Sequence, residues 1–344
     1  MTEPRTRHET PIAVIGSGTM GAGIAQIFAQ AGYPVRLQAR KRETLDAALR
    51  RIRVNQDELI RHELLAAADA EVAGGRITVT QDLKEALAGA AFVSENIPER
   101  IDLKQPLFAK LDRLTPAETI LSTNTSSLPI TQVARDTKHP ERVVGFHWFN
   151  PPHLIPLVEV IRGDRTADAT MDETYRLAQA IGKSPIRVQK DIPGFVGNRL
   201  QRSLEREFFY LERIGACSGA DLEVALKQGL GFRWSVVSPL EHADLVGVDT
   251  HSATVSLLFP LLSTDTQPPP LFADLVAKGR LGAKTGAGVY EYGPGEVERI
   301  LARRNTMLID FIKVLRKHPP LRAPGTHAEW QVSPPERSRR GSAA

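Results

Sequence analysis

The chain has 344 residues, 42% of them hydrophobic and 24% charged, which is typical of a globular protein with two domains or one large one. Its formal charge of +4 lies mostly in residues 317–344, which hold five Lys or Arg and two Glu, so we expect no nucleic-acid partner. The single cysteine, Cys217, excludes an internal disulfide, and no apolar run reaches the roughly 18 residues of a membrane span, so we expect a cytoplasmic protein with no membrane partner. Cys217 has no Cys/His cluster near it, and we expect no metal site.

The first residues, MTEPRTRHET, have mixed charge and no apolar core, so we do not expect a signal peptide. Apolar runs and helical segments then alternate. We expect strands within residues 11–16, 34–39, 91–97, 119–124 and 142–149, helices at 19–32 and from 43 to about 70, and helical segments before the third and fourth of these strands. This alternation predicts a parallel sheet with right-handed crossovers.

The pattern changes after Asn150. The run LIPLVEVI follows RVVGFHWF across NPP, which predicts an antiparallel hairpin, and a helix at 174–182 and a last strand at 185–189 complete the sheet. From Gly194 to Lys317 nearly everything has helical spacing. We therefore predict an α/β fold with three parts: a first domain over 1–192, an all-helical domain over 193–317 and a tail over 318–344. The tail is rich in Pro, Ser and Arg and poor in apolar residues, so we expect it to be disordered.

The segment VIGSGTMGAG carries Gly16, Gly18 and Gly21 in G-x-G-x-x-G spacing between a strand and a helix that starts near Thr19 and Met20. The first glycine permits a tight turn, the second lets a pyrophosphate approach the backbone, and the third lets helix and strand pack closely. The helix N-terminus also offers free N–H groups to an anion. We predict that these five residues bind a dinucleotide, so the first domain is expected to be of the Rossmann type.

The second strand ends without the acidic residue that usually holds a ribose. Ala39 stands there, followed by Arg40, Lys41 and Arg42. A carboxylate would repel a 2′-phosphate, whereas guanidinium groups attract one, so we favour NADP(H) bound near Ala39 and Arg40. The alternative is that these cations line the start of the next helix, that Glu43 serves the ribose, and that the cofactor is NAD(H).

His147 and Glu159 lie on the two arms of the predicted hairpin. A hairpin centred on His153 would place them opposite one another. A carboxylate that fixes the tautomer of an imidazole leaves the other ring nitrogen free to exchange a proton with a substrate. The alternative is a buried histidine that is satisfied by backbone groups.

Polar residues also follow the strand at 119–124 and open the helical domain. Asn124, Ser126 and Ser127 stand just past a strand's carboxyl end, where open α/β sheets bind ligands, and Asn198 follows a Pro-Gly turn. Asparagine and serine are suitable donors to a carbonyl or alkoxide oxygen. They can also serve as turn or helix caps, and Asn198 in particular fits that alternative.

The segments GSGTMGAGIAQ, STNTSSLPI, GFHWFNPPHLIPLVEVI and DIPGFVGNRL resemble the 3-hydroxyacyl-CoA dehydrogenases, and the resemblance covers roughly residues 10–295. It implies that His147 is the acid/base, that Glu159 orients it, and that Ser126 and Asn198 contact substrate and nicotinamide. It also places Glu99, Lys104 and Asn124 near the cofactor and implies a homodimer formed through the helical domain. The implied reaction moves a hydride between nicotinamide and C3 of an L-3-hydroxyacyl-CoA.

Other segments resemble the lambda-crystallin and L-gulonate 3-dehydrogenase branch, whose substrates are free hydroxy acids: NPPHLIPLVE, PIRVQKDIPGFVGNRLQ and GLGFRWSVVSPLE. The CoA-binding members place lysines in the helical pair after the second strand, where this chain has DELIRHELL without a lysine. Arg233 is suited to a substrate carboxylate or to a structural role at a helix end. NTSSL and HWFNP favour the acyl-CoA substrate; the alternatives are a free 3-hydroxy acid and, third, a non-catalytic crystallin-like protein.

Overall fold

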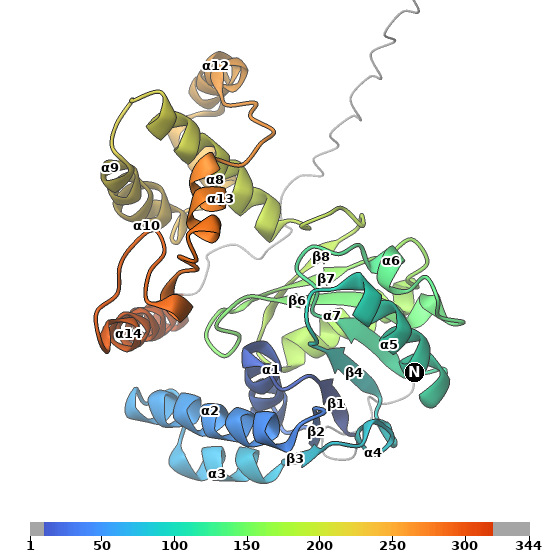
Figure 1. The fold of residues 1–344 in the computed structure, drawn as a ribbon. Coiled ribbons are helices and arrows are strands. Elements are labelled where there is room, and N and C mark those ends of the chain that lie inside the picture. The colour runs from blue at the N-terminus through green and yellow to red at the C-terminus, as the bar shows by residue number, and fades with distance from the viewer. Residues whose placement is uncertain (1–9, 319–344) are drawn as a thin grey trace, which may run out of the picture.

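The structure, a computed structural model, describes residues 10–318 of the chain. The predicted disordered tail therefore lies, apart from His318, outside the described residues. An eight-stranded sheet forms the first half of the molecule (Figure 1). Its strands are β1 (Ile12–Ile15), β2 (Val35–Gln38), β3 (Ile77–Thr80), β4 (Phe92–Glu95), β5 (Ile120–Thr123), β6 (Val143–Trp148), β7 (Leu157–Ile161) and β8 (Ser184–Val188).

The strand order is β3-β2-β1-β4-β5-β6-β7-β8. Strands β1 to β6 pair in parallel, β7 pairs antiparallel with β6, and β8 pairs in parallel with β7. The predicted parallel sheet and the predicted hairpin across NPP are thus both confirmed. Because the order reverses beside β1, the carboxyl ends of β1, β4 and β5 border a crevice of the kind in which such sheets bind ligands.

Helices cover both faces of the sheet. They are α1 (Thr19–Gln30), α2 (Arg42–Arg61), α3 (Ala67–Gly75), α4 (Leu83–Leu87), α5 (Ile101–Leu114), α6 (Ile130–Val133) and α7 (Asp168–Ala180), with a 3₁₀ turn at Pro140–Arg142. Alternate residues of β1 point to opposite faces, so Ile12 and Val14 pack with α1, α2 and α7, while Ala13 and Ile15 pack with α4, α5 and α6. Each face therefore has its own continuous apolar core.

The second half is helical, as the sequence predicts. It contains α8 (Gly197–Arg213), α9 (Gly219–Val224), a π-helical turn (Ala225–Leu230), α10 (Gly231–Trp234), α11 (Pro239–Val246), α12 (Val248–Leu258), α13 (Pro270–Ala277) and α14 (Glu296–Lys317), with 3₁₀ turns at Phe259–Leu261 and Ala283–Thr285. In Figure 1, α8 leads away from the sheet, and the helices that follow lie apart from it. The fold class, a Rossmann-type domain followed by a helical domain, is confirmed.

The last helix, α14, returns to the Rossmann-type domain. Ile309 is fully buried and packs with Leu59 of α2 and with Leu154. The side chain of Asn305 donates a hydrogen bond of 2.8 Å to the carboxylate of Glu58. The helical region is therefore attached to the sheet domain at two places, by the chain that leads into α8 and by the contact between α14 and α2.

Strand β3 was not among the strands expected from the sequence. It is an edge strand that pairs only with β2, and its residues are half-buried or exposed, so it lacks the apolar run that marks the central strands. Its signal is weaker: the alternation in RITVT that follows Gly74 and Gly75. No helix among residues 10–318 is long and apolar enough to cross a membrane.

Candidate active site

The glycine bend between β1 and α1 has the backbone that its spacing predicts. Gly16 has a φ of +98°, and a Cβ atom there would lie 2.6 Å from the carbonyl oxygen of Asn96. A Cβ at Gly21 would lie 1.8 Å from the carbonyl oxygen of Gly16, whereas a Cβ at Gly18 would meet no atom within 4 Å. The bend is thus closed where the chain packs on itself and open at the residue expected to face a pyrophosphate.

The start of α1 adds an electrostatic attraction at the same place. No side chain caps the helix N-terminus at Gly18, and Thr19 is exposed while Met20 is half-buried. The first N–H groups of the helix therefore point toward the open side of the bend, which suits an anionic group. The arrangement fits the dinucleotide that the sequence predicts.

The residues after β2 are placed as the sequence suggested. Ala39 is buried, and the side chains of Arg40 and Lys41 are exposed, with no hydrogen bond or ion pair to any residue between 10 and 318. Arg42 differs because it opens α2 and pairs with Asp46 at 3.0 Å. Two free cations thus remain beside the end of β2, and Glu43 lies exposed in the first turn of α2.

His147 and Glu159 face each other across the hairpin. They are directly paired in the register of β6 and β7, and Nδ1 of His147 lies 2.7 Å from Oε2 of Glu159. Both side chains are buried. With Nδ1–H donated to the carboxylate, the imidazole keeps its Nε2 free, since that atom has no partner within residues 10–318. The structure thus has the two side chains in the opposed positions that the hairpin predicts.

The second oxygen of Glu159 is held by the start of α8. Its Oε1 accepts hydrogen bonds from the backbone N–H groups of Val196 (3.0 Å) and Gly197 (2.8 Å). Burial alone would raise the pKa of the Glu159 carboxyl, but the hydrogen bond from His147, these two N–H groups and the charge of His147 together lower the pKa. The first helix of the helical domain therefore helps keep this carboxylate ionised.

Two aromatic rings and a glycine lie where the start of α8 approaches Glu159. The imidazole of His147 contacts the rings of Phe149 and Phe195, whose centroids lie 4.7 and 5.7 Å from its own. A Cβ at Gly197 would lie 2.5 Å from the Phe149 ring, so a side chain there would push the helix away from Glu159. Phe195 itself has a φ of +51°, a rare value for a residue with a side chain, which turns the next two N–H groups toward the carboxylate.

Asn198, Ser126 and Asn124 line the same region. The side-chain amide of Asn198 donates to the carbonyl oxygen of Ser126 at 2.8 Å, so Asn198 joins the two segments rather than capping α8, whose N-cap is Val196. Asn124 uses both ends of its amide within the protein: it donates to Asn96 (3.0 Å) and accepts from the backbone N–H of Trp148 (2.9 Å). The cap alternative for Asn198 is therefore wrong.

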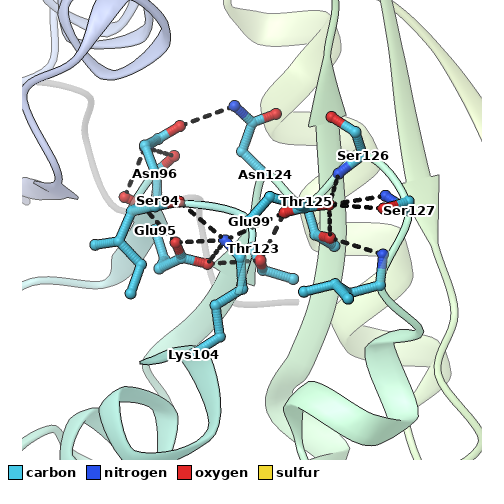
Figure 2. A network of polar contacts seen from close by, with 12 residues as sticks. Ser94, Glu95, Asn96, Glu99, Lys104, Thr123, Asn124, Thr125, Ser126 and Ser127 are labelled. Atoms are coloured by element: carbon cyan, nitrogen blue, oxygen red, sulfur yellow. Dashed lines mark hydrogen bonds and ion pairs between the residues drawn. The ribbon is translucent and has the colours of Figure 1, made fainter. Parts of the chain in front are cut away.

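Glu99 and Lys104, which the resemblance places near the cofactor, contact the protein itself. The ammonium group of Lys104 is buried and donates to both oxygens of Glu95, at 2.7 and 2.8 Å. Glu99 accepts hydrogen bonds from the turn at Thr125–Ser127. The ammonium group of Lys104 is therefore not exposed to a ligand. Its Nζ lies 3.8 Å from Oε2 of Glu99 (Figure 2).

Sequence reasoning missed several residues of this region. Glu95, Asn96, Phe149, Phe195 and Gly197 all contact predicted site residues, yet none was singled out. Glu95 had a usable signal, because a carboxylate at the end of an apolar strand run requires a buried partner. The roles of the rings and of Gly197 depend on how close α8 approaches β7, which spacing does not reveal.

Two family models match the chain in succession. Residues 11–192 match the 3-hydroxyacyl-CoA dehydrogenase NAD-binding domain. Residues 194–292 match the 3-hydroxyacyl-CoA dehydrogenase C-terminal domain. The junction between the two matches falls in the segment that leads into α8.

Individual proteins are similar over most of the chain. A 5-formyl-3-hydroxy-2-methylpyridine 4-carboxylate 5-dehydrogenase from Mesorhizobium japonicum is 35% identical over 307 residues, 88% of this chain and 97% of that protein. A solved structure of such an enzyme, an NAD⁺-dependent dismutase, superposes with a TM-score of 0.82 at 33% identity, covering 89% of this chain and 98% of the other. An (S)-3-hydroxybutyryl-CoA dehydrogenase from Ralstonia eutropha gives a TM-score of 0.68 at 34% identity, covering 82% and 99%.

Proposed function

The chain belongs to the 3-hydroxyacyl-CoA dehydrogenase family and is a nicotinamide-dependent dehydrogenase, and from this premise we propose that it oxidises or reduces a small hydroxy acid that carries a free carboxylate. The observation that carries the proposal is the buried pair of His147 and Glu159, in a chain that also has the glycine bend of a dinucleotide site. His147 is its acid/base, Glu159 its orienting carboxylate, and Ser126 and Asn198 the polar groups nearest the substrate.

The roles follow from the chemistry of these side chains. During oxidation, Nε2 of His147 removes the hydroxyl proton, and during reduction the protonated ring returns it to the oxygen. Glu159 holds Nδ1–H, so the tautomer with a free Nε2 is the one presented to the substrate. The bound nicotinamide accepts or supplies the hydride, and the bend at Gly16, Gly18 and Gly21, with Thr19 and Met20, would hold its pyrophosphate.

Two observations favour a free acid over an acyl-CoA. The superposition with the pyridine carboxylate dehydrogenase extends over more of this chain than that with the hydroxybutyryl-CoA dehydrogenase and has the higher TM-score. The stretch DELIRHELL, where CoA-binding members have lysines, has no lysine to pair with CoA phosphates. It is also partly occupied by α14, because Glu58 is bonded to Asn305 and Leu59 packs on Ile309.

A 3-hydroxyacyl-CoA remains the second candidate because both family models carry that name. The test is a matrix of initial rates with acetoacetyl-CoA, free 3-oxo acids, gulonate and the pyridine 4-carboxylate, each with both cofactors. We expect the highest kcat/KM with a free acid. The highest value with acetoacetyl-CoA would reverse the order of the two candidates, and no cofactor turnover with any of them would contradict the proposal.

We propose NADP(H) as the preferred cofactor, because Ala39 leaves space and Arg40 and Lys41 present two unpaired cations at the end of β2. Arg40→Asp replaces one attractive charge with a repulsive one, so kcat/KM with NADPH should fall about tenfold or more while that with NADH stays within about twofold. The ratio of the two values measures the effect. An unchanged ratio would mean that NAD(H) is bound instead, with Glu43 as the candidate ribose ligand.

We also propose that a second copy of the chain covers the helical region. Large apolar side chains are exposed along α10, α11, α12 and the turn after it, among them Phe232, Leu245, Leu257, Phe259 and Leu261. The other domain packs most of its apolar side chains into two cores, so an apolar surface of this extent is typical of a permanent homodimer interface.

A further inference from the structure

The segment that joins β6 to β7 lies next to the acid/base pair. His147 and Glu159 pair one position before the end at which the two strands are joined. The joining segment, residues 149–156, belongs to no strand of the sheet, and it turns back on itself where the backbone N–H of Leu154 donates to the carbonyl oxygen of Pro151 at 3.0 Å. The position of this end of the hairpin therefore depends on what the joining segment contacts.

The joining segment packs on α1, the helix that begins at the glycine bend. A Cβ atom at Gly23 would lie 2.5 Å from Cγ of Pro152, so the proline ring lies against the backbone of α1 and leaves no room for a side chain there. The ring of Trp148, the residue before the segment, also contacts Phe28 of α1, with centroids 6.0 Å apart. The end of the hairpin and the helix expected to bind the cofactor are thus in direct contact.

Lys183 binds the same segment from the turn between α7 and β8. Its ammonium group donates to the carbonyl oxygens of Pro152 at 2.6 Å and of Ile155 at 2.7 Å. The next residue, Ser184, donates its backbone N–H to the carbonyl oxygen of Pro156 at 2.9 Å. Two consecutive residues therefore hold three carbonyl oxygens of the joining segment.

The buried charge of Lys183 has no carboxylate beside it. The residue is 8% exposed, and within residues 10–318 no Asp or Glu forms an ion pair with it. The ring of Trp148 lies 5.2 Å from its ammonium nitrogen, and burial lowers the pKa of Lys183 to about 8. Burying an uncompensated charge costs free energy, so an apolar side chain would serve packing alone at least as well. An apolar side chain could not, however, donate to two carbonyl oxygens at once.

We propose that Lys183 is a positioning residue for the acid/base pair, because it holds the joining segment on α1 and so fixes where His147 stands relative to the bound cofactor. The inference rests on the proposed function, since it takes His147 as the acid/base. Within residues 10–318 no hydrogen bond joins Lys183 to His147 or Glu159, so Lys183 acts through the segment.

The first experiment compares Lys183→Met with Lys110→Met, which replaces an exposed lysine of α5. Methionine has a similar length but neither charge nor donor, so the carbonyl oxygens of Pro152 and Ile155 lose the group that binds them. Without cofactor, hydrogen–deuterium exchange of a peptide spanning 149–157 should become about tenfold faster in Lys183→Met and stay unchanged in Lys110→Met.

Kinetic constants separate positioning from folding. At a temperature well below the melting temperature of each variant, kcat of Lys183→Met should fall about tenfold, because His147 is no longer held at its distance from nicotinamide. Kd for the cofactor should stay within about twofold, because the glycine bend is unchanged. Lys183→Arg keeps a cation with several donors, so its kcat should lie closer to that of the wild type than the kcat of Lys183→Met does.

The second experiment moves the segment without changing Lys183. In Gly23→Ala the new methyl group meets Pro152 and pushes the segment away from α1, whereas Gly74→Ala on α3 adds a methyl group that meets no atom within 4 Å. Both changes add an alanine to a helix, so their effects on helix propensity are matched. Gly23→Ala should show faster exchange of the 149–157 peptide and a lower kcat, and Gly74→Ala should show neither.

Two results would overturn the inference. One is a folded Lys183→Met in which the 149–157 peptide exchanges at the wild-type rate. The other is a wild-type kcat in Lys183→Met or Gly23→Ala although the peptide exchanges faster; the position of the segment would then not matter for the reaction. If Lys183→Met does not fold, Gly23→Ala and its control decide by the same two criteria. Because exchange needs no turnover, its result does not depend on whether the substrate matrix shows activity.

Discussion

In the Rossmann-type domain, apolar side chains of the strands and of α1, α2, α5 and α7 fill two continuous cores. Between residues 197 and 318, in contrast, the buried apolar side chains are Leu222, Ala243 and Ile309, and the long helix α8 buries no residue. Both regions contain many apolar residues. The difference is that the first region covers its own apolar surface and the second does not.

This contrast suggests that the two regions have different tasks: the first carries the proposed acid/base pair, and the second carries the apolar surface proposed to form the dimer. His147 and Glu159 both lie on strands of the Rossmann-type domain, so the register that pairs them is set by that domain. The helical region contributes at its very start, where the N–H groups of Val196 and Gly197 reach Glu159 and Asn198 reaches Ser126. Changes in the two regions should therefore affect different measurements.

The largest effect is expected at His147. His147→Ala removes the proposed acid/base, so kcat should fall about 10²- to 10⁴-fold, while cofactor binding and the oligomeric state remain those of the wild type. Rates with the best substrate of the matrix, together with fluorescence titration of the reduced cofactor, measure both quantities. Activity within a few-fold of the wild type would remove His147 from the mechanism.

A smaller effect is expected from charges placed on the helical surface. Leu257 and Leu261 are 68% and 66% exposed, and the double variant Leu257→Asp/Leu261→Asp should weaken a dimer by about 2 kcal/mol or more per subunit. Sedimentation at decreasing protein concentration should then show a monomer at concentrations where we expect the wild type to be a dimer.

The matched control lies in the other domain. Val54 and Val72, on α2 and α3, are 63% and 54% exposed, so they differ from the two leucines mainly in location. Val54→Asp/Val72→Asp should leave both the mass and the melting temperature unchanged. If this control dissociated the dimer and the leucine variant did not, the interface would lie on the Rossmann-type domain.

Sequence patterns predicted most of the fold because the central strands begin with buried apolar residues. Residues 12–15, 92–95 and 120–123 are fully buried, and each strand starts with two or more apolar side chains, whereas the edge strand β3 is partly solvated and was missed. The helical spacing after Gly194 was equally clear. The helical spacing of apolar residues does not reveal whether the apolar face of a helix is covered by the same chain or by a second one.

The part of the candidate site that could be predicted from the sequence is the pair of residues that face each other across the hairpin. The hairpin across NPP determined which residue of β7 faces His147, and Glu159 followed. Contacts between segments far apart in the sequence were not predictable in the same way. Glu99 and Ser126 are 27 residues apart and Asn198 and Ser126 are 72 apart, and their contacts depend on how loops fold beyond the ends of the strands.

The smallest effect is expected where the two regions meet, at Glu159. The pKa of its carboxyl is lowered because His147, Gly197 and Val196 all donate to it despite its burial. A group with a lowered pKa in the folded state stabilises the fold above its unfolded pKa of about 4.3, and that contribution is lost as the pH falls through the folded pKa. Glu159→Gln keeps an acceptor oxygen but not the charge, so it should cost about 1 kcal/mol at neutral pH.

The cost should depend on pH in one direction. Urea unfolding of wild type and Glu159→Gln at matched pH should show the full difference in free energy of unfolding between about pH 5 and 7, and a shrinking difference below about pH 4. Comparison at the same pH cancels the titration of other carboxylates. A difference that stays constant down to pH 3 would mean that folding does not lower the pKa of this carboxyl. The start of α8 would then be a neutral contact of the sheet domain rather than the point at which the helical region acts on the acid/base pair.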